Sequence, residues 1–306
     1  MTDKTVKNIA ASIRQKLLNN ANETGRPFQE VLQYFAMERF LYRLSRSPHA
    51  DKFVLKGALM FTAWGAPSTR PTKDIDFLAR MSNSVEAIVA VMREVCVQEV
   101  EPDGLVFDAE GLAGSVIKED ADYEGVRVTF RATLENARVP MQLDLGFGDV
   151  MTPGPESTIY PTILDLPAPH LSGYSRETVV AEKFEAMVKL GLLNSRMKDF
   201  SDVWTLSRQF AFDGALLAQA IARTFDHRGT LITSKPTALT SAFATDPGKA
   251  TQWRGFLRKS RLSAVPDDLD QIIIDLAEFL GPVAKALEAA VRFVHVWSPP
   301  GPWRRA

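Results

Sequence analysis

The segment Arg70-Pro71-Thr72-Lys73-Asp74-Ile75-Asp76-Phe77-Leu78 predicts a short β-strand that carries two carboxylates on one face. Successive side chains of a strand point to opposite faces, so Asp74 and Asp76 share a face while Ile75 and Phe77 turn toward the core. Two neighbouring carboxylates repel each other, and a divalent cation bridged to phosphate oxygens relieves that repulsion. The segment therefore favours a metal and phosphate site, with a solvated strand end as the plainer alternative.

A glycine turn precedes this strand. The residues Lys56-Gly57-Ala58 follow the apolar run Phe53-Val54-Leu55 and lead into a short helical run that ends at Trp64. Gly57 has no side chain, which would let the backbone approach a phosphate group closely. Lys56 and Arg70 bracket the region and are candidate phosphate ligands. The alternative for Lys56, as for Lys73, is a basic side chain that serves only solubility.

The order of these elements resembles the polymerase β-like nucleotidyltransferase superfamily, in which a glycine turn and a helix precede an Asp-x-Asp strand. The form Lys-Gly-Ala…Arg-Pro-Thr-Lys-Asp-Ile-Asp is similar to the AbiEii branch, the toxins of type IV toxin–antitoxin pairs. Three later segments follow in the expected order, and they are Val139–Asp149, Ser175–Met187 and Asn194–Leu206. The turn departs from the Gly-Gly or Gly-Ser of other branches, so a hydroxyl that could contact phosphate is absent.

The resemblance implies a third carboxylate on the strand within Val139–Asp149. Asp144 is the first candidate, and Asp149 in the following loop is the second. Asp144 also lies between Leu143 and Leu145, where an unpaired carboxylate would be costly, and this position favours a functional role. By resemblance, Asp74, Asp76 and Asp144 would hold Mg²⁺ or Mn²⁺, and an NTP would be the substrate.

The resemblance also assigns roles to the later helical segments. Lys183 would neutralise charge on the triphosphate, and Asp202 would pair with Lys183 or orient the acceptor hydroxyl. The implied catalytic residues are thus Asp74, Asp76, Asp144, Lys183 and Asp202, and the implied nucleotide or phosphate contacts are Lys56, Gly57, Arg70, Arg196, Lys198 and Asp199. The residues alone allow plainer interpretations, since Lys183 could pair with Glu182 or Glu185. The Arg196–Asp202 cluster could be an ordinary helix start with an i,i+3 salt bridge.

The composition agrees with a soluble cytoplasmic enzyme. The 306 residues carry 36 Lys and Arg against 37 Asp and Glu, so a net charge of -1 gives no sign of global nucleic-acid binding. A local basic face can still bind RNA. The single cysteine, Cys96, fits a reducing compartment and a place in the core. We expect no signal peptide and no apolar run of about 20 residues that could span a bilayer.

The pattern along the chain predicts an α+β fold with two domains. By resemblance, residues 1–170 would be the nucleotidyltransferase domain, formed by a small mixed sheet with packed helices. Residues 171–306 would be a helical domain that completes the active site. Helices are predicted at 5–21, 28–46 and 84–96, and short strands at 104–107, 115–119 and 127–134. The Pro-rich tail Ser298–Arg305 cannot continue a helix and is expected to be a loosely held end.

Two basic clusters lie in the helical part. They are residues 223–235 and the group Arg254, Arg258, Lys259 and Arg261, with which Trp253 and Phe256 alternate. Such a face could bind an RNA backbone and stack a base. The alternative is a solvated basic helix with Trp253 in the core.

Three functional hypotheses follow. The first is a metal-dependent nucleotidyltransferase that acts on an acceptor which, by resemblance, is the 3′ end of tRNA, with a role as a toxin or in phage defence beside a cognate antitoxin. The second transfers NMP to a protein side chain or a small molecule. The third is a catalytically inactive nucleotide-binding module. The intact carboxylates argue against the third, and the motifs do not separate the first two.

Overall fold

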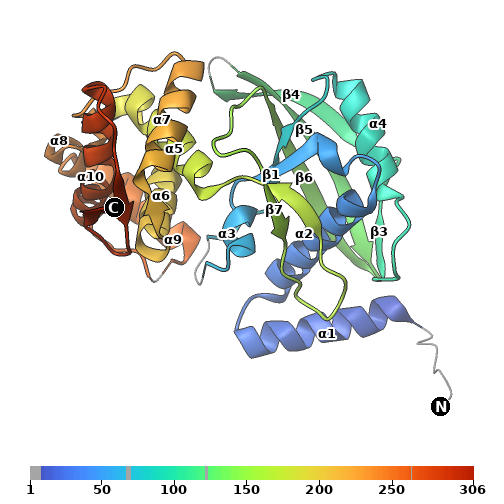
Figure 1. Ribbon diagram of the computed structural model, residues 1–306. Helices are drawn as coiled ribbons and strands as arrows, with labels where there is room; N and C mark the ends of the chain where they lie inside the picture. Colours follow the sequence, from blue (N-terminus) through green and yellow to red (C-terminus); the bar gives the residue numbers. More distant parts are fainter. Residues whose placement is uncertain (1–7, 67–69, 121–122, 263) are drawn as a thin grey trace. The chain divides into compact units, whose positions relative to one another are not determined.

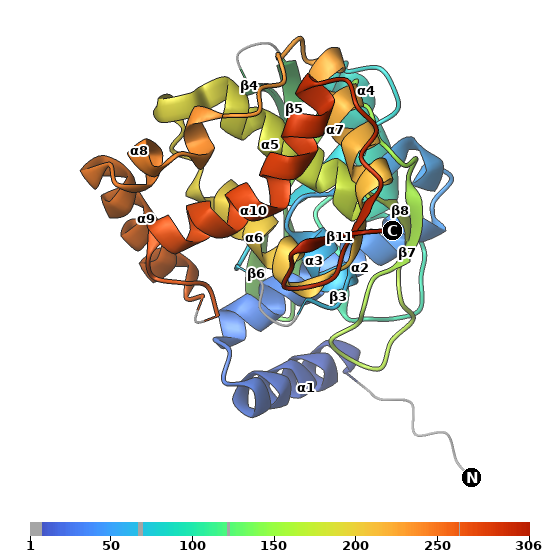
Figure 2. The same ribbon diagram turned by 60° about the vertical axis from the view of Figure 1, so that its left-hand side comes forward.

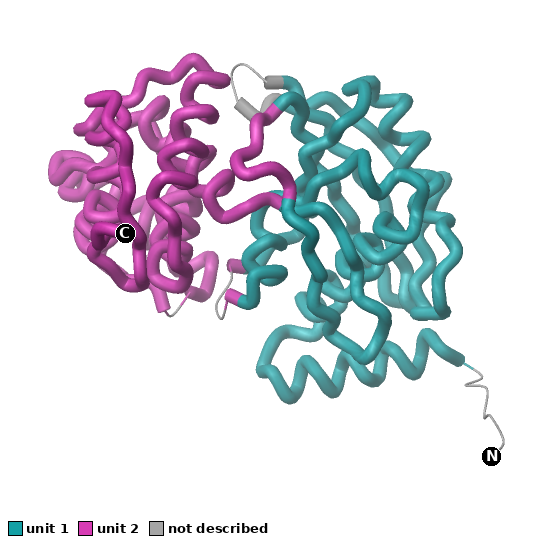
Figure 3. Tube along the Cα trace, in the orientation of Figure 1, with its two compact units in different colours: residues 1–65, 71–148, 156–173 teal, residues 66–70, 149–155, 174–306 magenta. Residues whose placement is uncertain are grey.

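The computed structural model describes residues 8–66, 70–120, 123–262 and 264–306. The chain forms two compact units (Figure 3). Unit 1 contains residues 1–65, 71–148 and 156–173, and unit 2 contains residues 66–70, 149–155 and 174–306. The predicted α+β class is confirmed, because unit 1 is built on a mixed sheet and unit 2 is mainly helical.

The sheet of unit 1 has eight strands in the order β3-β5-β6-β2-β1-β8-β7, and β4 also pairs with β5. The pairs β2–β6 and β1–β8 are parallel, and β1–β2 and β5–β6 are antiparallel. The strands are β1 Phe53–Lys56, β2 Ile75–Ala79, β3 Leu105–Phe107, β4 Ala113–Asp120, β5 Tyr123–Leu134, β6 Ala137–Phe147, β7 Glu156–Ile159 and β8 His170–Gly173.

The α-helices in the described part of unit 1 are α1 Ile9–Thr24, α2 Phe28–Arg46, α3 Leu59–Ala63 and α4 Val85–Cys96 (Figure 1). α4 begins where the sequence predicts, because the hydroxyl of Ser84 accepts a hydrogen bond from the backbone N–H of Ala87. Ile88, Val91, Met92 and Val95 of this helix are buried, and Cys96 is part of the core. Residues 5–7 of the predicted first helix lie outside the described residues.

Unit 2 is a helical bundle with a small added sheet. α10 packs on α6 and α7, and α7 packs on α5 (Figures 1 and 2). Its helices are α5 Arg176–Leu190, α6 Met197–Gln209, α7 Gly214–His227, α8 Ser241–Ala244, α9 Pro247–Ser260 and α10 Leu269–Glu288. The sheet joins β9 Phe212–Asp213, β10 His295–Trp297 and β11 Trp303–Arg305 in the order β11-β10-β9.

The prediction of a loosely held tail is wrong. The Pro-rich turn at residues 298–302 reverses the chain, so that β11 pairs with β10. The Trp303 ring stacks on Phe279 with 5.7 Å between centroids, and its Nε1–H donates to the Phe279 carbonyl at 2.8 Å. Aromatic burial and strand pairing fix a segment whose local sequence predicts only the absence of a helix.

Candidate active site

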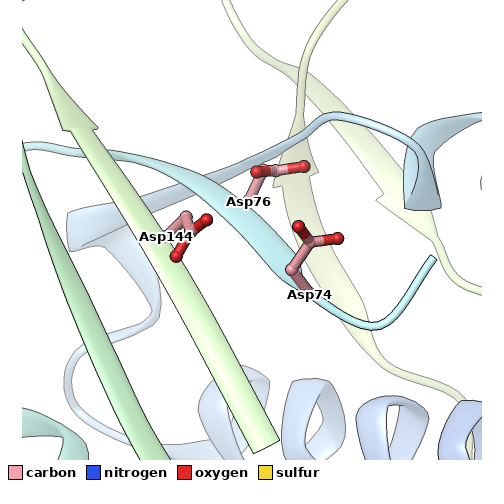
Figure 4. A group of neighbouring side chains, drawn as sticks. All are labelled: Asp74, Asp76 and Asp144. Carbon is pink, nitrogen blue, oxygen red and sulfur yellow. The ribbon is translucent and has the colours of Figure 1, made fainter. Parts of the chain in front are cut away.

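Three carboxylates of unit 1 meet at one place on the sheet. Ligand oxygens of Asp74, Asp76 and Asp144 all lie within 4.8 Å of one another (Figure 4). Asp76 and Asp144 are paired residues of the parallel strands β2 and β6, and Asp74 directly precedes β2. Ile75 and Phe77 are buried on the opposite face, as the alternation predicts. The described residues thus present an oxygen-rich group of the kind that Mg²⁺ and Mn²⁺ bind.

The triad lies within a charged row that crosses four strands. Lys56 on β1 is paired with Asp76 on β2, Asp76 with Asp144 on β6, and Asp144 with Arg127 on β5. Two cationic residues therefore flank two of the three carboxylates in register. Cross-strand neighbours of opposite charge attract, and this order offsets part of the repulsion within the triad.

Arg127 is a site residue that sequence reasoning missed. Its Nε–H donates to Asp144 Oδ1 at 2.8 Å and an Nη2–H donates to Oδ2 at 2.7 Å. The hydrogen bonds to Asp144 raise the pKa of Arg127, and the charges of Asp144, Asp74 and Asp76 act in the same direction. The guanidinium therefore stays charged beside the triad.

The hairpin register could have identified Arg127. β5 and β6 are joined by the two-residue turn Glu135-Asn136, and Leu134 pairs with Ala137. Seven residues back from Leu134 and seven forward from Ala137 lie Arg127 and Asp144. A short hairpin loop fixes the register of its strands, so the turn was the available signal.

Two further residues orient Asp74, and neither was predicted to do so. The buried Thr72 donates from its hydroxyl to Asp74 Oδ1. The backbone N–H of Thr72 donates to the Tyr34 hydroxyl of α2 at 3.1 Å. Outer hydrogen bonds of this kind fix the direction in which a carboxylate presents its oxygens.

Gly57 lies against the side chain of Asp76 and not against open space. The glycine has φ +74°, and a Cβ at this position would lie 1.9 Å from Asp76 Oδ2. An L side chain is therefore excluded on two grounds, the left-handed backbone and the adjacent carboxylate. The predicted approach of Gly57 to a phosphate stays a prediction.

The residues predicted on the later helices form an ion-pair cluster within unit 2. Lys183 Nζ lies 2.6 Å from Asp199 Oδ1 and 3.0 Å from Asp202 Oδ2. Arg196 Nε lies 2.8 Å from Asp199 Oδ2, and Arg70 Nε lies 3.3 Å from Asp202 Oδ1. These four ion pairs converge on Asp199 and Asp202, whereas Lys198, also predicted for this group, has an exposed side chain.

Charge pairing keeps both ends of the cluster ionised. Burial disfavours the ammonium of Lys183, but the charges of Asp199 and Asp202 outweigh it and raise the pKa of Lys183. Burial likewise opposes ionisation of Asp199, and the charges of Lys183 and Arg196 outweigh it and lower the pKa of Asp199. The structure places Lys183 with these aspartates rather than with Glu182 or Glu185.

Asp149, the second candidate for the third carboxylate, is engaged elsewhere in unit 2. Its Oδ1 accepts a hydrogen bond from Arg228 Nη2 at 3.0 Å. Arg228 also pairs with Glu185 at 3.0 Å and with Glu182 at 3.7 Å. The acidic triad contains Asp144 and not Asp149.

Trp253 of α9 is a core residue, as the alternative interpretation of this cluster expected. Trp253 is fully buried, and its Nε1–H donates to the Pro266 carbonyl at 3.1 Å. Stacking of Trp253 on a nucleic-acid base is therefore excluded, because the ring has no exposed face. The basic residues of the same cluster, Arg254, Arg258, Lys259 and Arg261, have exposed side chains.

Within the described ranges, none of the helices has the length and apolar character needed to cross a membrane.

The chain is similar to one protein family and to two solved structures. The model of the AbiEii family, described as the nucleotidyl transferase toxin of a type IV toxin–antitoxin system, matches residues 39–275. No curated protein matches the chain. Two solved structures are similar at 15% identity over 86% of this chain, each with a TM-score of 0.46. One is a candidate nucleotidyltransferase from H. pylori with 96% of its chain covered, and the other is JHP933 from Helicobacter pylori with 93% covered.

Proposed function

Because the chain belongs to the AbiEii family of type IV toxin–antitoxin nucleotidyltransferases, we propose that it transfers a nucleotide from an NTP to the 3′ end of a tRNA. The observation that carries this proposal is the triad of Asp74, Asp76 and Asp144 on neighbouring strands. Nucleotidyl transfer needs positioning and charge neutralisation more than covalent help from the protein, and three converging carboxylates suit that task.

The donor set fits a divalent cation. Asp74, Asp76 and Asp144 supply carboxylate oxygens, the ligands that Mg²⁺ and Mn²⁺ prefer, from positions close enough to share an ion. A bound Mg²⁺ or Mn²⁺ would neutralise charge on the triphosphate and make the acceptor hydroxyl more acidic. Thr72 holds Asp74 in place for this purpose, and Gly57 leaves the room that Asp76 occupies.

The cationic residues named by the family resemblance have proposed roles at the phosphates. Lys56 and Arg70 would bind phosphate oxygens, and Lys183 would bind the triphosphate in its charged form. The ion pairs of Lys183 with Asp199 and Asp202 keep its ammonium group positively charged. Arg196 and Lys198 would order the surroundings of Asp199.

An RNA acceptor is supported by the exposed face of α9. Arg254 and Arg258 lie one turn apart on one stripe of α9, and Arg261 caps the C-terminal end of the helix beyond them. Residues 247–260 include no Asp or Glu. A stripe of arginines without neighbouring acids favours the phosphate backbone of a nucleic acid.

The test is transfer of labelled nucleotide. Purified protein is incubated with total RNA, Mg²⁺ and each α-³²P-labelled NTP separately, beside the Asp74→Ala variant. We expect label on tRNA with one NTP and none with the variant, because Asp74 contributes ligands but little packing. Label on protein, or on a small molecule, would replace the tRNA proposal by the second hypothesis. Equal label with the variant would refute the assigned site.

The biological setting follows from the family. We propose that the enzyme acts in the cytoplasm as a growth-inhibiting toxin in phage defence, and that a cognate antitoxin counteracts it. NTPs and tRNA are cytoplasmic substrates, and the single buried Cys96 needs no oxidising compartment. Growth arrest on expression, abolished by Asp74→Ala, would support this setting, whereas arrest by the variant would contradict it.

A further inference from the structure

The third carboxylate of the triad is already bound by a cation of the protein itself. Arg127 donates from Nε and Nη2 to the two oxygens of Asp144 at 2.8 and 2.7 Å. A guanidinium and a carboxylate in this fork arrangement form one of the strongest pairings between side chains. Asp144 therefore has its negative charge largely compensated before any metal ion arrives.

The same oxygens are the ones that a metal ion needs. Asp144 contributes to the triad through a carboxylate oxygen, and both of its oxygens accept hydrogen bonds from Arg127. The guanidinium lies against the carboxylate that would hold a divalent cation, and two cations at one carboxylate repel each other. Each oxygen keeps a second lone pair, so it is this repulsion that makes Arg127 and the metal ion competitors for Asp144.

The surroundings of Asp144 would keep its carboxylate oriented if the Arg127 guanidinium turned away from it. The side chain of Arg127 is 39% exposed, whereas that of Asp144 is 10% exposed. Gln142, two residues before Asp144 on the same face of β6, has its Nε2 at 3.3 and 3.2 Å from the two oxygens. The amide would continue to orient the carboxylate after the guanidinium turned toward solvent.

We propose that Arg127 is a positioning residue that holds Asp144 in the metal-free protein and competes with the divalent cation for its oxygens. Arg127 then sets the threshold of metal concentration at which the third ligand becomes free. This inference rests on the proposed metal site and deepens it, because it assigns a role to a residue outside the acidic triad.

The test is direct Mn²⁺ binding, without NTP or RNA. Chelator-treated protein is titrated with Mn²⁺, and free Mn²⁺ is followed by its electron paramagnetic resonance signal. We expect Arg127→Gln to bind Mn²⁺ roughly tenfold more tightly, because one unit of positive charge near the ion is removed. Arg127→Lys keeps the charge but loses the fork, so its Mn²⁺ affinity should lie between those of the parent protein and Arg127→Gln.

Arg131→Gln is the matched control. Arg131 lies four residues further on β5, on the same face, and pairs with Pro140 instead of an acid. The control makes the same change of net charge and should leave the Mn²⁺ affinity unchanged.

Two results would overturn the role of Arg127. Equal affinity of Arg127→Gln and the parent would reduce Arg127 to a structural residue, and weaker binding would make it a helper of the metal site rather than a competitor. Asp144→Asn separates this inference from the proposed function. If Asp144→Asn binds Mn²⁺ like the parent, the metal site itself is wrong, whatever Arg127 does. Thermal unfolding of each variant confirms that the affinities are those of folded protein.

Discussion

Gly57 lies so close to Asp76 that a Cβ at residue 57 would be 1.9 Å from the Asp76 carboxylate. The glycine belongs to the turn after β1, and Asp76 belongs to the neighbouring strand β2. The turn therefore forms one wall around a carboxylate of the acidic triad. This contact gives the glycine a role toward the protein's own ligand, beside the phosphate contact predicted from the sequence.

Substitution of Gly57 should damage the site more than the fold. Gly57→Ala forces a left-handed residue with a side chain against Asp76, and we expect transfer to fall at least about tenfold through misplacement of the carboxylate. Gly65→Ala is the matched control, since Gly65 also has a positive φ, +72°, but nothing lies within 4 Å of its Cβ position. Both variants should lose about 1 kcal/mol of stability from backbone strain. Nucleotide transfer and urea unfolding separate the two effects, and equal losses of transfer would contradict the contact argument.

The hydroxyl of Thr72 should matter to metal binding. Thr72→Val keeps the shape and removes the hydrogen bond to Asp74, so we expect metal affinity and transfer to fall about 10- to 100-fold. Thr72→Ser retains the hydroxyl and should preserve most of both. Mn²⁺ titration of the two variants provides the measurement. A Thr72→Ser variant as impaired as Thr72→Val would mean that packing, and not the hydrogen bond, is the contribution of Thr72.

Asp199 should make stability sensitive to acid. Its pKa is lowered in the folded protein, so its contribution is present above the unfolded pKa of about 3.9 and is lost as pH falls through the folded pKa. Asp199→Asn leaves Lys183 and Arg196 with less compensation and should remove about 3 kcal/mol at pH 7. Urea midpoints between pH 7 and pH 3 give the comparison. The parent should lose stability over this range more steeply than Asp199→Asn, and parallel curves would argue against the ionised buried aspartate.

The arginine stripe of α9 should govern RNA affinity through charge. We expect Arg254→Ala combined with Arg258→Ala to weaken tRNA binding. The slope of log affinity against log salt concentration should also fall by the amount that corresponds to about two phosphate contacts. Lys16→Ala on α1 is the control, since Lys16 is an exposed lysine of unit 1. Filter binding at several salt concentrations measures both quantities. An unchanged salt slope in the double variant would show that α9 does not contact the RNA backbone.

Some features of the site could be predicted because they depend on neighbours along the chain. Alternation alone places Asp74 and Asp76 on one face and Ile75 and Phe77 on the other, and the structure confirms this arrangement. The helix predicted at 84–96 is local in the same sense, because α4 begins at Val85 after the Ser84 cap. Such features follow from strand and helix geometry, which each short segment carries within itself.

The choice between partners required the tertiary structure. The sequence offered both Asp144 and Asp149, and strand pairing places Asp144 beside Asp76 while Arg228 binds Asp149. The same holds for Lys183, which could have paired with adjacent glutamates but reaches Asp199 and Asp202 on the next helix.

By itself, the sequence determined which residue types share a strand face and which segments are helical, since these depend on backbone periodicity. Only the tertiary structure decided that Arg127 binds Asp144, that Gly57 borders Asp76, and that the Pro-rich tail is held by Phe279. Each of these contacts joins segments that are separated in the chain, and its energy depends on the register and packing of whole elements rather than on local preference.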